Sequence, residues 1–324
     1  MSNKAVLLQT RSLSVGYEKP QKQVLLENLH LALPAGSLVC FMGPNGIGKS
    51  TLLRTLAGLQ KPLSGEVILS AEKPGPTETF VSVVLTDRTP ALYLTAEEVI
   101  AFGRYPYLNW LAQLSAHDRN VIEQAIATTH VAAFRHRKMF ELSDGQIQLT
   151  MIARALAQET PVMLLDEPTA HLDLNNRVEI MNMLREIARQ QGKAVLVATH
   201  ELDLALQTAD LIWLAGEQRN VLTGFPEDLV LNGVFDTIFR FKGFDLKTGK
   251  IQHNPWRNVP VTLTGEGAEY LWTKNALERN GYGVQAESSI LVEVKRSHEL
   301  MWLVNGQACH SLEEVITVLN RNSC

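Results

Sequence analysis

The sequence has few cysteines, little excess charge and no long apolar run. Its three cysteines are widely spaced, so they predict neither a zinc site nor a disulfide framework and favour a reducing compartment. A net charge of −4 argues against a general affinity for nucleic acid, and the basic run at residues 135–138 is expected to be a solvated patch or to lie near lipid head groups. Apolar runs such as 161–165 and 194–198 fall far short of the roughly 20 residues that span a bilayer. Any membrane role is therefore expected to require a partner. No signal peptide is expected.

Short apolar runs alternate along the chain with segments of helical periodicity. This pattern predicts an α/β protein with a mostly parallel, buried sheet, whose strands are expected at residues 38–42, 80–85, 161–165, 194–198 and 211–214. Helices are expected after Thr95, which can form a capping box with Glu98, after Ser115, and from about Asn175 to Gly192. The third helix is expected to bury a stripe of Val178, Met181, Leu184 and Ile187.

The composition changes near residues 240–260, where turn-forming residues replace long periodic segments. We place a domain boundary there, with a larger domain at residues 1–240 and a small α+β domain at residues 241–324. The small domain shows helix-like patterns at 270–283 and 311–321 and strand-like patterns at 290–294 and 301–304. It carries no motif with evident chemistry, so dimer stabilisation or regulation is a hypothesis based on its position alone.

The most specific motif is a glycine-rich turn that matches the phosphate-binding pattern G-x-x-x-x-G-K-[ST]. In such a loop, backbone N–H groups and a helix N-terminus bind phosphate, so a nucleoside triphosphate is the expected class of ligand. Lys49 is expected to contact the β- and γ-phosphates, and Ser50 to ligate Mg²⁺. An accidental glycine-rich turn is the alternative, which the flanking apolar strand and helix disfavour; that helix is expected to carry Leu52, Leu53, Leu56 and Leu59 on one side. The expected ATP-binding residues of the loop are Gly43, Pro44, Asn45, Gly46, Ile47, Gly48, Lys49, Ser50 and Thr51.

A second motif is the apolar run at residues 161–165, which ends in the carboxylates of Asp166 and Glu167. Asp166 is expected to hold Mg²⁺ at the end of a strand. Glu167 is expected to face the γ-phosphate and to activate the attacking water as a general base. A buried strand that meets solvent at an acidic turn is common by itself, but the phosphate-binding loop upstream favours the catalytic interpretation.

The segment Leu142-Ser143-Asp144-Gly145-Gln146 resembles the signature motif of ABC-type ATPases, and the resemblance extends over about residues 5–240. It implies a homodimer in which Ser143, Gly145 and Gln146 contact ATP held by the opposite subunit. Residues 168–173 resemble the D-loop of the family, which adds Asp173 to that contact across the dimer.

Two further residues agree with the family in order and spacing. His200 matches the switch histidine and joins Glu167 and Lys49 as an expected catalytic residue. Tyr17 matches the aromatic residue that stacks on adenine. Taken singly, such a histidine is more often structural and such a tyrosine more often a packed surface residue.

The sequence departs from the family pattern at two positions. Thr86, followed by Asp87, stands where the family usually has a glutamine that contacts Mg²⁺ and senses the permease. Thr86 is therefore expected to bind a metal-bound water or to be a plain strand-end residue, and Asp87 is the alternative contact. Asp144 replaces a signature glycine, and its carboxylate must point away from phosphate. At a helix N-terminus this charge is favourable by roughly 0.3–1 kcal/mol, which suggests that Asp144 caps the helix.

The resemblance implies an ATP-hydrolysing subunit that drives a separate membrane permease. Residues 94–107 resemble the corresponding segment in importers of iron–siderophore complexes, haem and cobalamin, a region that faces the permease. We therefore predict a homodimeric importer ATPase at the cytoplasmic face of the cell membrane, which works indirectly with a substrate-binding protein and not with nucleic acid. Helix-end packing of Arg104 and the aromatic residues beside it is the alternative explanation of that segment.

Three other functions use the same phosphate-binding loop. An exporter subunit differs only in its permease and in the direction of transport. Soluble ABC ATPases of DNA repair usually split the cassette around coiled coils, and those of translation carry two cassettes, whereas this sequence shows neither feature. A small-molecule kinase is disfavoured by the signature and D-loop motifs.

Overall fold

The computed structural model describes residues 4–19, 21–70, 80–85, 92–239, 241, 244–246, 250–251, 255–296 and 300–322. Thr86 and Asp87, the candidates for contact with metal-bound water, lie outside the described residues. The chain divides into two compact units, Met1–Arg240 and Phe241–Cys324.

The centre of the larger unit is a six-stranded sheet in the order β10-β9-β4-β8-β7-β6. Its strands run parallel except for β10, which pairs antiparallel with β9. Every residue of β4, β7 and β8 is buried, which explains the unbroken apolar runs that predicted them. The bounds are β4 Ser37–Met42, β6 Val81–Val84, β7 Val162–Asp166, β8 Ala194–Ala198, β9 Leu211–Ala215 and β10 Val221–Gly224.

A second, antiparallel sheet packs on the first and was not predicted. Strand β1 pairs with β2, β3 and β5, and one core cluster joins Leu8 and Leu26 of this sheet to Phe41 of the parallel sheet. Register shifts in β1 interrupt the alternation of buried and exposed residues, so its sequence lacks a clear strand period. The larger unit therefore contains mixed sheets, with β1 Val6–Tyr17, β2 Gln23–Leu29, β3 Ala32–Pro34 and β5 Ser64–Leu69.

Helices α1 and α5 form as predicted in outline, but in each case one residue that was predicted to lie on the apolar face is exposed. Helix α1 ends at Leu56, so Leu59 lies beyond it and is 63% exposed. In α5, Met181, Leu184 and Ile187 are buried, whereas Val178 is 37% exposed. Gly192 ends α5 in the left-handed conformation, as predicted. The helices of this part are α1 Lys49–Leu56, α5 Leu174–Gln191, α6 Leu202–Thr208, α7 Pro226–Leu231 and α8 Val234–Phe239.

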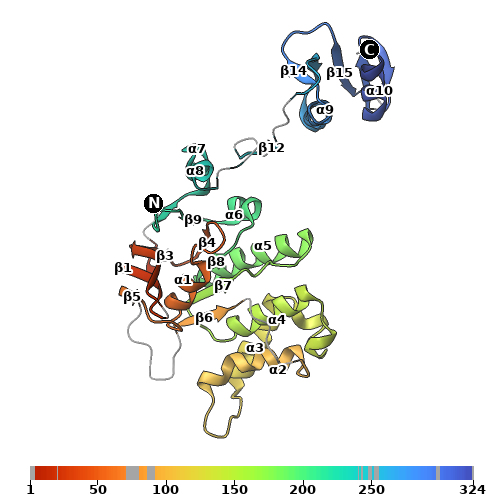
Figure 1. Ribbon diagram of the computed structural model, residues 1–324. Coiled ribbons are helices and arrows are strands. Elements are labelled where there is room, and N and C mark those ends of the chain that lie inside the picture. Colours follow the sequence, from red (N-terminus) through yellow and green to blue (C-terminus); the bar gives the residue numbers. More distant parts are fainter. Residues whose placement is uncertain are drawn as a thin grey trace. The chain divides into compact units, whose positions relative to one another are not determined.

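A group of helices, here called the helical group, is inserted between β6 and β7 and gathers beside those strands (Figure 1). Capping boxes begin all three α-helices of the group, at Thr95 with Glu98, at Ser115 with Asp118 and at Ser143 with Gln146. The basic run is exposed at residues 136–138, as predicted, whereas Arg135 bonds both Glu97 and Glu123 and is only 20% exposed. The helical group comprises α2 Ala96–Ala101, the 3₁₀ turns η1 Phe102–Tyr107, η2 Val131–Ala133 and η3 Met139–Glu141, and the helices α3 Ala116–Thr128 and α4 Asp144–Leu156.

The smaller unit contains a five-stranded sheet in the order β14-β13-β15-β16-β17. Its own core includes Tyr282, Trp302 and Val315, so this unit has a hydrophobic centre of its own. The predicted helix-like and strand-like segments form here in outline, but the first helix ends at Arg279 and Gly283 begins a strand. The elements of this unit are β11 Phe244–Asp245, β12 Lys250–Ile251, β13 Pro260–Thr264, α9 Gly267–Arg279, β14 Gly283–Gln285, β15 Leu291–Arg296, β16 Leu300–Val304, β17 Gln307–Cys309 and α10 Leu312–Asn322.

Candidate active site

The carboxyl ends of β4, β8 and β7 meet at one edge of the sheet, because these neighbouring strands run parallel. Strand β4 leads into Gly43, β7 ends at Asp166, and β8 leads into Thr199 and His200. Open parallel sheets bind their ligands at this edge. Segments that lie far apart in the sequence therefore form one site.

The glycines of the phosphate-binding loop adopt conformations that other residues rarely reach. Gly43 has φ 155°, and a Cβ there would lie 2.9 Å from the carbonyl oxygen of Ala215. Gly48 has φ 110° as the N-cap of α1, and its Cβ would lie 3.0 Å from Leu25 Cβ. The glycine spacing is thus a steric requirement of the loop that precedes α1.

Lys49 lies inside the loop and is 9% exposed. Its Nζ donates hydrogen bonds to the carbonyl oxygens of Gly43 at 3.0 Å and Pro44 at 3.4 Å. Burial lowers the pKa of Lys49, while the negative charges of Glu167 and Asp166 act to raise it. The lysine ammonium therefore lies within electrostatic reach of both carboxylates at the end of β7.

Tyr17 stands beside α1, where its hydroxyl is 3.1 Å from Thr51 Oγ1. The tyrosine side chain is 46% exposed, so it is available to a planar ligand next to the loop. This position fits the adenine-stacking role that the resemblance implies.

If Tyr17 stacks on adenine, Tyr17→Ala is expected to weaken ATP binding. Loss of one base–aromatic stack costs about 1–3 kcal/mol, or roughly 5- to 150-fold in dissociation constant. Tyr17→Phe keeps the ring and loses only the contact with Thr51, so it is the matched control and is expected to bind ATP like the wild type. Calorimetric titration with ATP measures both variants, and equal affinities for the alanine variant and the wild type would remove the stacking role.

Glu167 is held in a strained conformation directly after β7. It has φ 51°, which costs a non-glycine residue on the order of 1–3 kcal/mol, and such strain gathers at functional sites. Its N–H donates to the carbonyl oxygen of Ala198 at 2.9 Å, and its Oε2 lies 2.7 Å from Nδ1 of His200. The pairing of β7 with β8 thus brings the predicted base and the predicted switch histidine together.

The oxygen donors at this edge suit a magnesium ion. Asp166 is 5% exposed at the end of β7, and Ser50 is exposed in the first turn of α1. Mg²⁺ usually takes one or two protein oxygens and completes its shell with phosphate oxygens and water. The donor set of Asp166 and Ser50 therefore fits Mg²⁺ bound together with ATP.

Ser143 caps the N-terminus of α4 in a reciprocal pair with Gln146. The Ser143 hydroxyl accepts from the Gln146 N–H at 3.3 Å, and Gln146 Oε1 accepts from the Ser143 N–H at 3.2 Å. Asp144 is the first helical residue, so the capping role predicted for it is wrong. The cap needs extended backbone, which Ser143 has, whereas the Asp144 carboxylate favours the helix only through its charge.

Asp173 caps α5 in a similar way and is bonded to Asn176, a residue that the sequence analysis missed. Asp173 accepts from the Asn176 N–H at 3.0 Å and from its Nδ2 at 2.8 Å. A Cβ on Gly145 would lie 3.4 Å from Asn176 Cγ, so the signature turn and the D-loop meet at this asparagine. Asp173 and Asn176 stand three residues apart at the start of a helix, and this spacing in the sequence could have predicted their contact. Ser143, Gly145, Gln146 and Asp173 thus form a second cluster, at the N-terminal ends of α4 and α5.

A phosphate-binding loop beside an acidic strand end, with a serine-capped helix in an inserted helical group, defines an ABC-type ATP-binding cassette. The chain belongs to the family of ABC transporter ATP-binding proteins, and it is an ATPase of that type. A family model described as ABC transporter matches residues 26–170, and one described as Iron ABC transporter C-terminal domain matches residues 258–320. A third model, for an AAA domain, matches residues 135–206 within the same cassette.

Curated relatives resemble most of the chain. An uncharacterized ABC transporter ATP-binding protein of Methanocaldococcus jannaschii is 33% identical over 86% of this chain and 98% of its own length. The achromobactin transport ATP-binding protein of Dickeya dadantii is 37% identical over 71% of this chain and 86% of its own length. The iron(3+)-hydroxamate import ATP-binding protein of Bacillus subtilis is 30% identical over 79% of this chain and 94% of its own length.

Solved structures show the same fold. An inward-facing transporter assigned to the metal-chelate type is 27% identical, with a TM-score of 0.65 over 73% of this chain and 90% of that one. A dimeric bacterial ABC transporter cassette is 26% identical, with a TM-score of 0.57 over 68% of this chain and 99% of that one. Within the part of the chain that the structure describes, no helix is both long and apolar enough to cross a membrane.

Proposed function

We propose that this chain is the ATP-hydrolysing subunit of an importer for an iron–siderophore complex, haem or a cobalamin-like substrate. The observation that carries the ATPase part is the Glu167–His200 pair, held 2.7 Å apart beside the phosphate-binding loop. The importer part is supported by the relatives that carry achromobactin and iron(3+)-hydroxamate in their names. The cytoplasmic face of the cell membrane is the proposed location, with a separate permease and, indirectly, a substrate-binding protein as partners.

In the proposed reaction, Glu167 accepts a proton from water as the water attacks the γ-phosphate in line. His200 orients the Glu167 carboxylate through the contact at its Nδ1. Lys49 and the N–H groups of the loop stabilise the charge that develops on the phosphate oxygens. Mg²⁺, when held by Asp166 and Ser50 with the nucleotide, supplies further neutralisation of that charge.

Two chains are proposed to enclose two ATP molecules, with the signature turn of one facing the phosphate-binding loop of the other. Ser143 and Asp144 are exposed at the start of α4 in the single chain, which leaves them available to a second copy, whereas Gly145 is buried. A helix N-terminus that presents N–H groups favours an anion such as the γ-phosphate. The existence of a dimeric cassette among the structural relatives supports this arrangement.

The permease is proposed to bind an apolar hollow on the helical group. The hollow has a volume of about 380 Å³ and is lined by residues that include Leu94, Phe102, Tyr105, Leu108 and Leu114. Phe102 is 53% exposed and Tyr105 72% exposed, so two large aromatic side chains face solvent at its wall. Exposed apolar surface rimmed by polar residues is typical of a protein contact.

Phe102→Ala together with Tyr105→Ala is expected to weaken binding to the permease that the proposed function requires. Removal of a buried aromatic anchor commonly costs about 2 kcal/mol or more, which corresponds to roughly 30-fold in affinity. Phe225→Ala is the matched control, since Phe225 is an exposed aromatic residue at the start of α7. Co-purification and permease-stimulated ATPase in liposomes measure the effect. Wild-type behaviour of the double variant would contradict this docking site, and substrate efflux instead of uptake would favour the exporter function.

Residues 241–324 are proposed to form a separate domain. Their independent core and the match of the Iron ABC transporter C-terminal domain model to residues 258–320 support this division. Its proposed role in dimer stability or regulation follows from its position after the cassette.

A further inference from the structure

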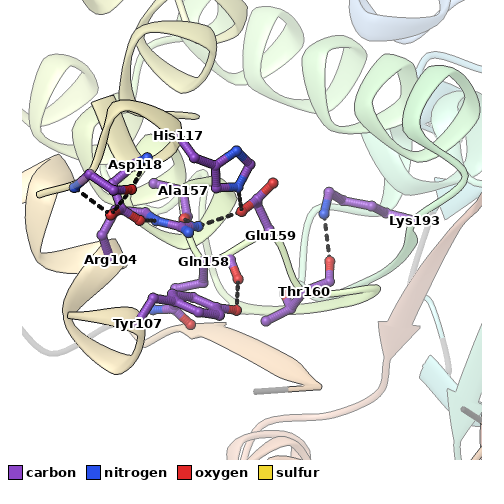
Figure 2. A network of polar contacts seen from close by, with 10 residues as sticks. Arg104, Tyr107, His117, Asp118, Ala157, Gln158, Glu159, Thr160 and Lys193 are labelled. Carbon is purple, nitrogen blue, oxygen red and sulfur yellow. Dashed lines mark hydrogen bonds and ion pairs between the residues drawn. The ribbon is translucent and has the colours of Figure 1, made fainter. Parts of the chain in front are cut away.

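Arg104 is buried in the helical group although exposed aromatic residues flank it on the same turn. Its side chain is 2% exposed, against 53% for Phe102 and 72% for Tyr105. Figure 2 shows the guanidinium enclosed between Asp118 and the end of α4. Arg104 therefore acts inside the protein, and the neighbouring aromatics alone face outward.

The guanidinium bonds to α3 and to the end of α4. Its Nε donates to Asp118 Oδ1 at 2.8 Å, and its Nη1 donates to the Ala157 carbonyl oxygen at 2.9 Å and to Glu159 Oε2 at 2.6 Å. Burial acts to raise the pKa of Asp118, but hydrogen bonds from Ser115 and Arg104 outweigh it and hold the pKa below its usual value. The buried arginine is thus compensated by charge and by the terminal carbonyls of α4.

Two other contacts join the η1 turn to the same end of α4. A Cβ on Gly103 would lie 2.4 Å from the Arg154 carbonyl oxygen, so the backbones of η1 and α4 are in close contact at this glycine. The Tyr107 hydroxyl donates to the Gln158 carbonyl oxygen at 2.6 Å. The inner side of η1 is therefore fastened along the last turn of α4.

Glu159 occupies a backbone conformation that favours glycine. It has φ 51° and lies three residues beyond Leu156, the last residue of α4, and a non-glycine residue pays roughly 1–2 kcal/mol in this conformation. Its carboxylate meets Arg104 and also His117 Nε2, at 3.0 Å. The glutamate therefore combines a strained backbone with two side-chain contacts, to Arg104 and to His117.

We propose that the ion pair between Arg104 and Glu159, here called the latch, makes η1 and α4 move as one rigid body. A displacement of Phe102 and Tyr105 by the permease would then be transmitted to Ser143 at the other end of α4. Helix α4 has 13 residues, from the turn at Ser143 to the latch. Such a helix is about 20 Å long and transmits displacement along its axis. Arg104 is a positioning residue, since its buried side chain bonds only to other parts of this chain among the described contacts. The inference rests on the proposed docking at Phe102 and Tyr105.

Two substitutions open the latch in different ways. Arg104→Gln removes the positive charge, and Glu159→Gly removes the carboxylate while it relieves the left-handed strain. Arg104→Lys keeps a charge toward Glu159 without the guanidinium fork, so it is expected to restore part of the function. His117→Gln is the matched control, because His117 contacts Glu159 from α3 and has no bond to η1 among the described contacts.

The experiment compares ATP hydrolysis by the isolated chain with substrate uptake by the reconstituted complex. We expect all four variants to hydrolyse ATP alone at the wild-type rate. Uptake per ATP is expected to fall roughly fivefold or more in Arg104→Gln and Glu159→Gly, the size of a typical coupling between sites. It is expected to recover partly in Arg104→Lys and to stay unchanged in His117→Gln.

Other outcomes separate this inference from the function on which it rests. If both latch variants keep wild-type uptake per ATP while Phe102→Ala with Tyr105→Ala loses the permease, the latch is overturned and the docking site stands. The latch is also overturned if the latch variants lose ATPase activity as isolated chains together with thermal stability, or if His117→Gln loses uptake per ATP to the same extent. Either result would show that Arg104 has a structural role only. If the wild-type chain fails to bind the permease, the proposed function and the latch fall together. Should Arg104→Gln not fold, Arg104→Lys and Glu159→Gly decide the question.

Discussion

Glu167→Gln is expected to abolish steady-state ATP turnover while ATP still binds. The amide has the shape of the carboxylate but cannot accept a proton from the attacking water. Loss of a general base typically lowers turnover by about 10²- to 10⁴-fold. Because the loop and Lys49 are unchanged, nucleotide affinity should persist, and the ATP-bound dimer should accumulate.

Phosphate release measures the loss of turnover, and size-exclusion chromatography with ATP measures the accumulation of the dimer. Glu179→Gln is the matched control, because Glu179 is an exposed carboxylate on α5 away from the sheet edge. It should hydrolyse ATP like the wild type and show no trapped dimer. Substantial hydrolysis by the Glu167 variant would refute the assignment of Glu167 as the base.

Two inactive variants are expected to regain hydrolysis when they are mixed. Lys49→Ala removes the charge from the phosphate-binding loop, a loss of about 10²- to 10³-fold for such an electrostatic contact. Ser143→Asp keeps a good N-cap for α4 but directs a carboxylate toward the γ-phosphate. Each homodimer then has two defective sites. A mixed dimer has one intact site, formed by Lys49 of one chain and Ser143 of the other.

An equal, random mixture should therefore recover about a quarter of wild-type turnover, as the twofold symmetry of the dimer requires. Mixing Lys49→Ala with a chain that carries both changes is the control, since no intact site can form and no recovery is expected. Ser143→Thr, which keeps a neutral cap, should remain active. Absence of recovery in mixed dimers shown to form would sink the model of sites shared between chains.

Much of the fold followed from local patterns. The apolar runs of β4, β7 and β8 were readable because these strands are buried on both faces. The capping boxes at Thr95 and Ser115 were readable because each depends on residues within one turn. The antiparallel sheet was missed because the alternation in β1 is broken by shifts in register.

The predictions that misjudged burial share a physical cause. Leu59 and Val178 continue a helical period that the structure does not bury, because α1 ends at Leu56 and the buried stripe of α5 begins at Ile180. Arg135 looks solvated in a basic run, but Glu97 and Glu123 approach it from α2 and α3. Burial depends on neighbours that are distant in sequence, so periodicity and charge alone cannot assign it.

The phosphate-binding loop was determined by the sequence itself, because Gly43 and Gly48 satisfy local backbone demands that a linear motif can encode. Tertiary structure alone decided that Glu167 meets His200 at 2.7 Å, since this contact requires β7 and β8 to pair in register. It also decided that Arg104 turns inward to Glu159 while Phe102 turns outward, because only the packing of η1 on α4 distinguishes the two sides of that turn.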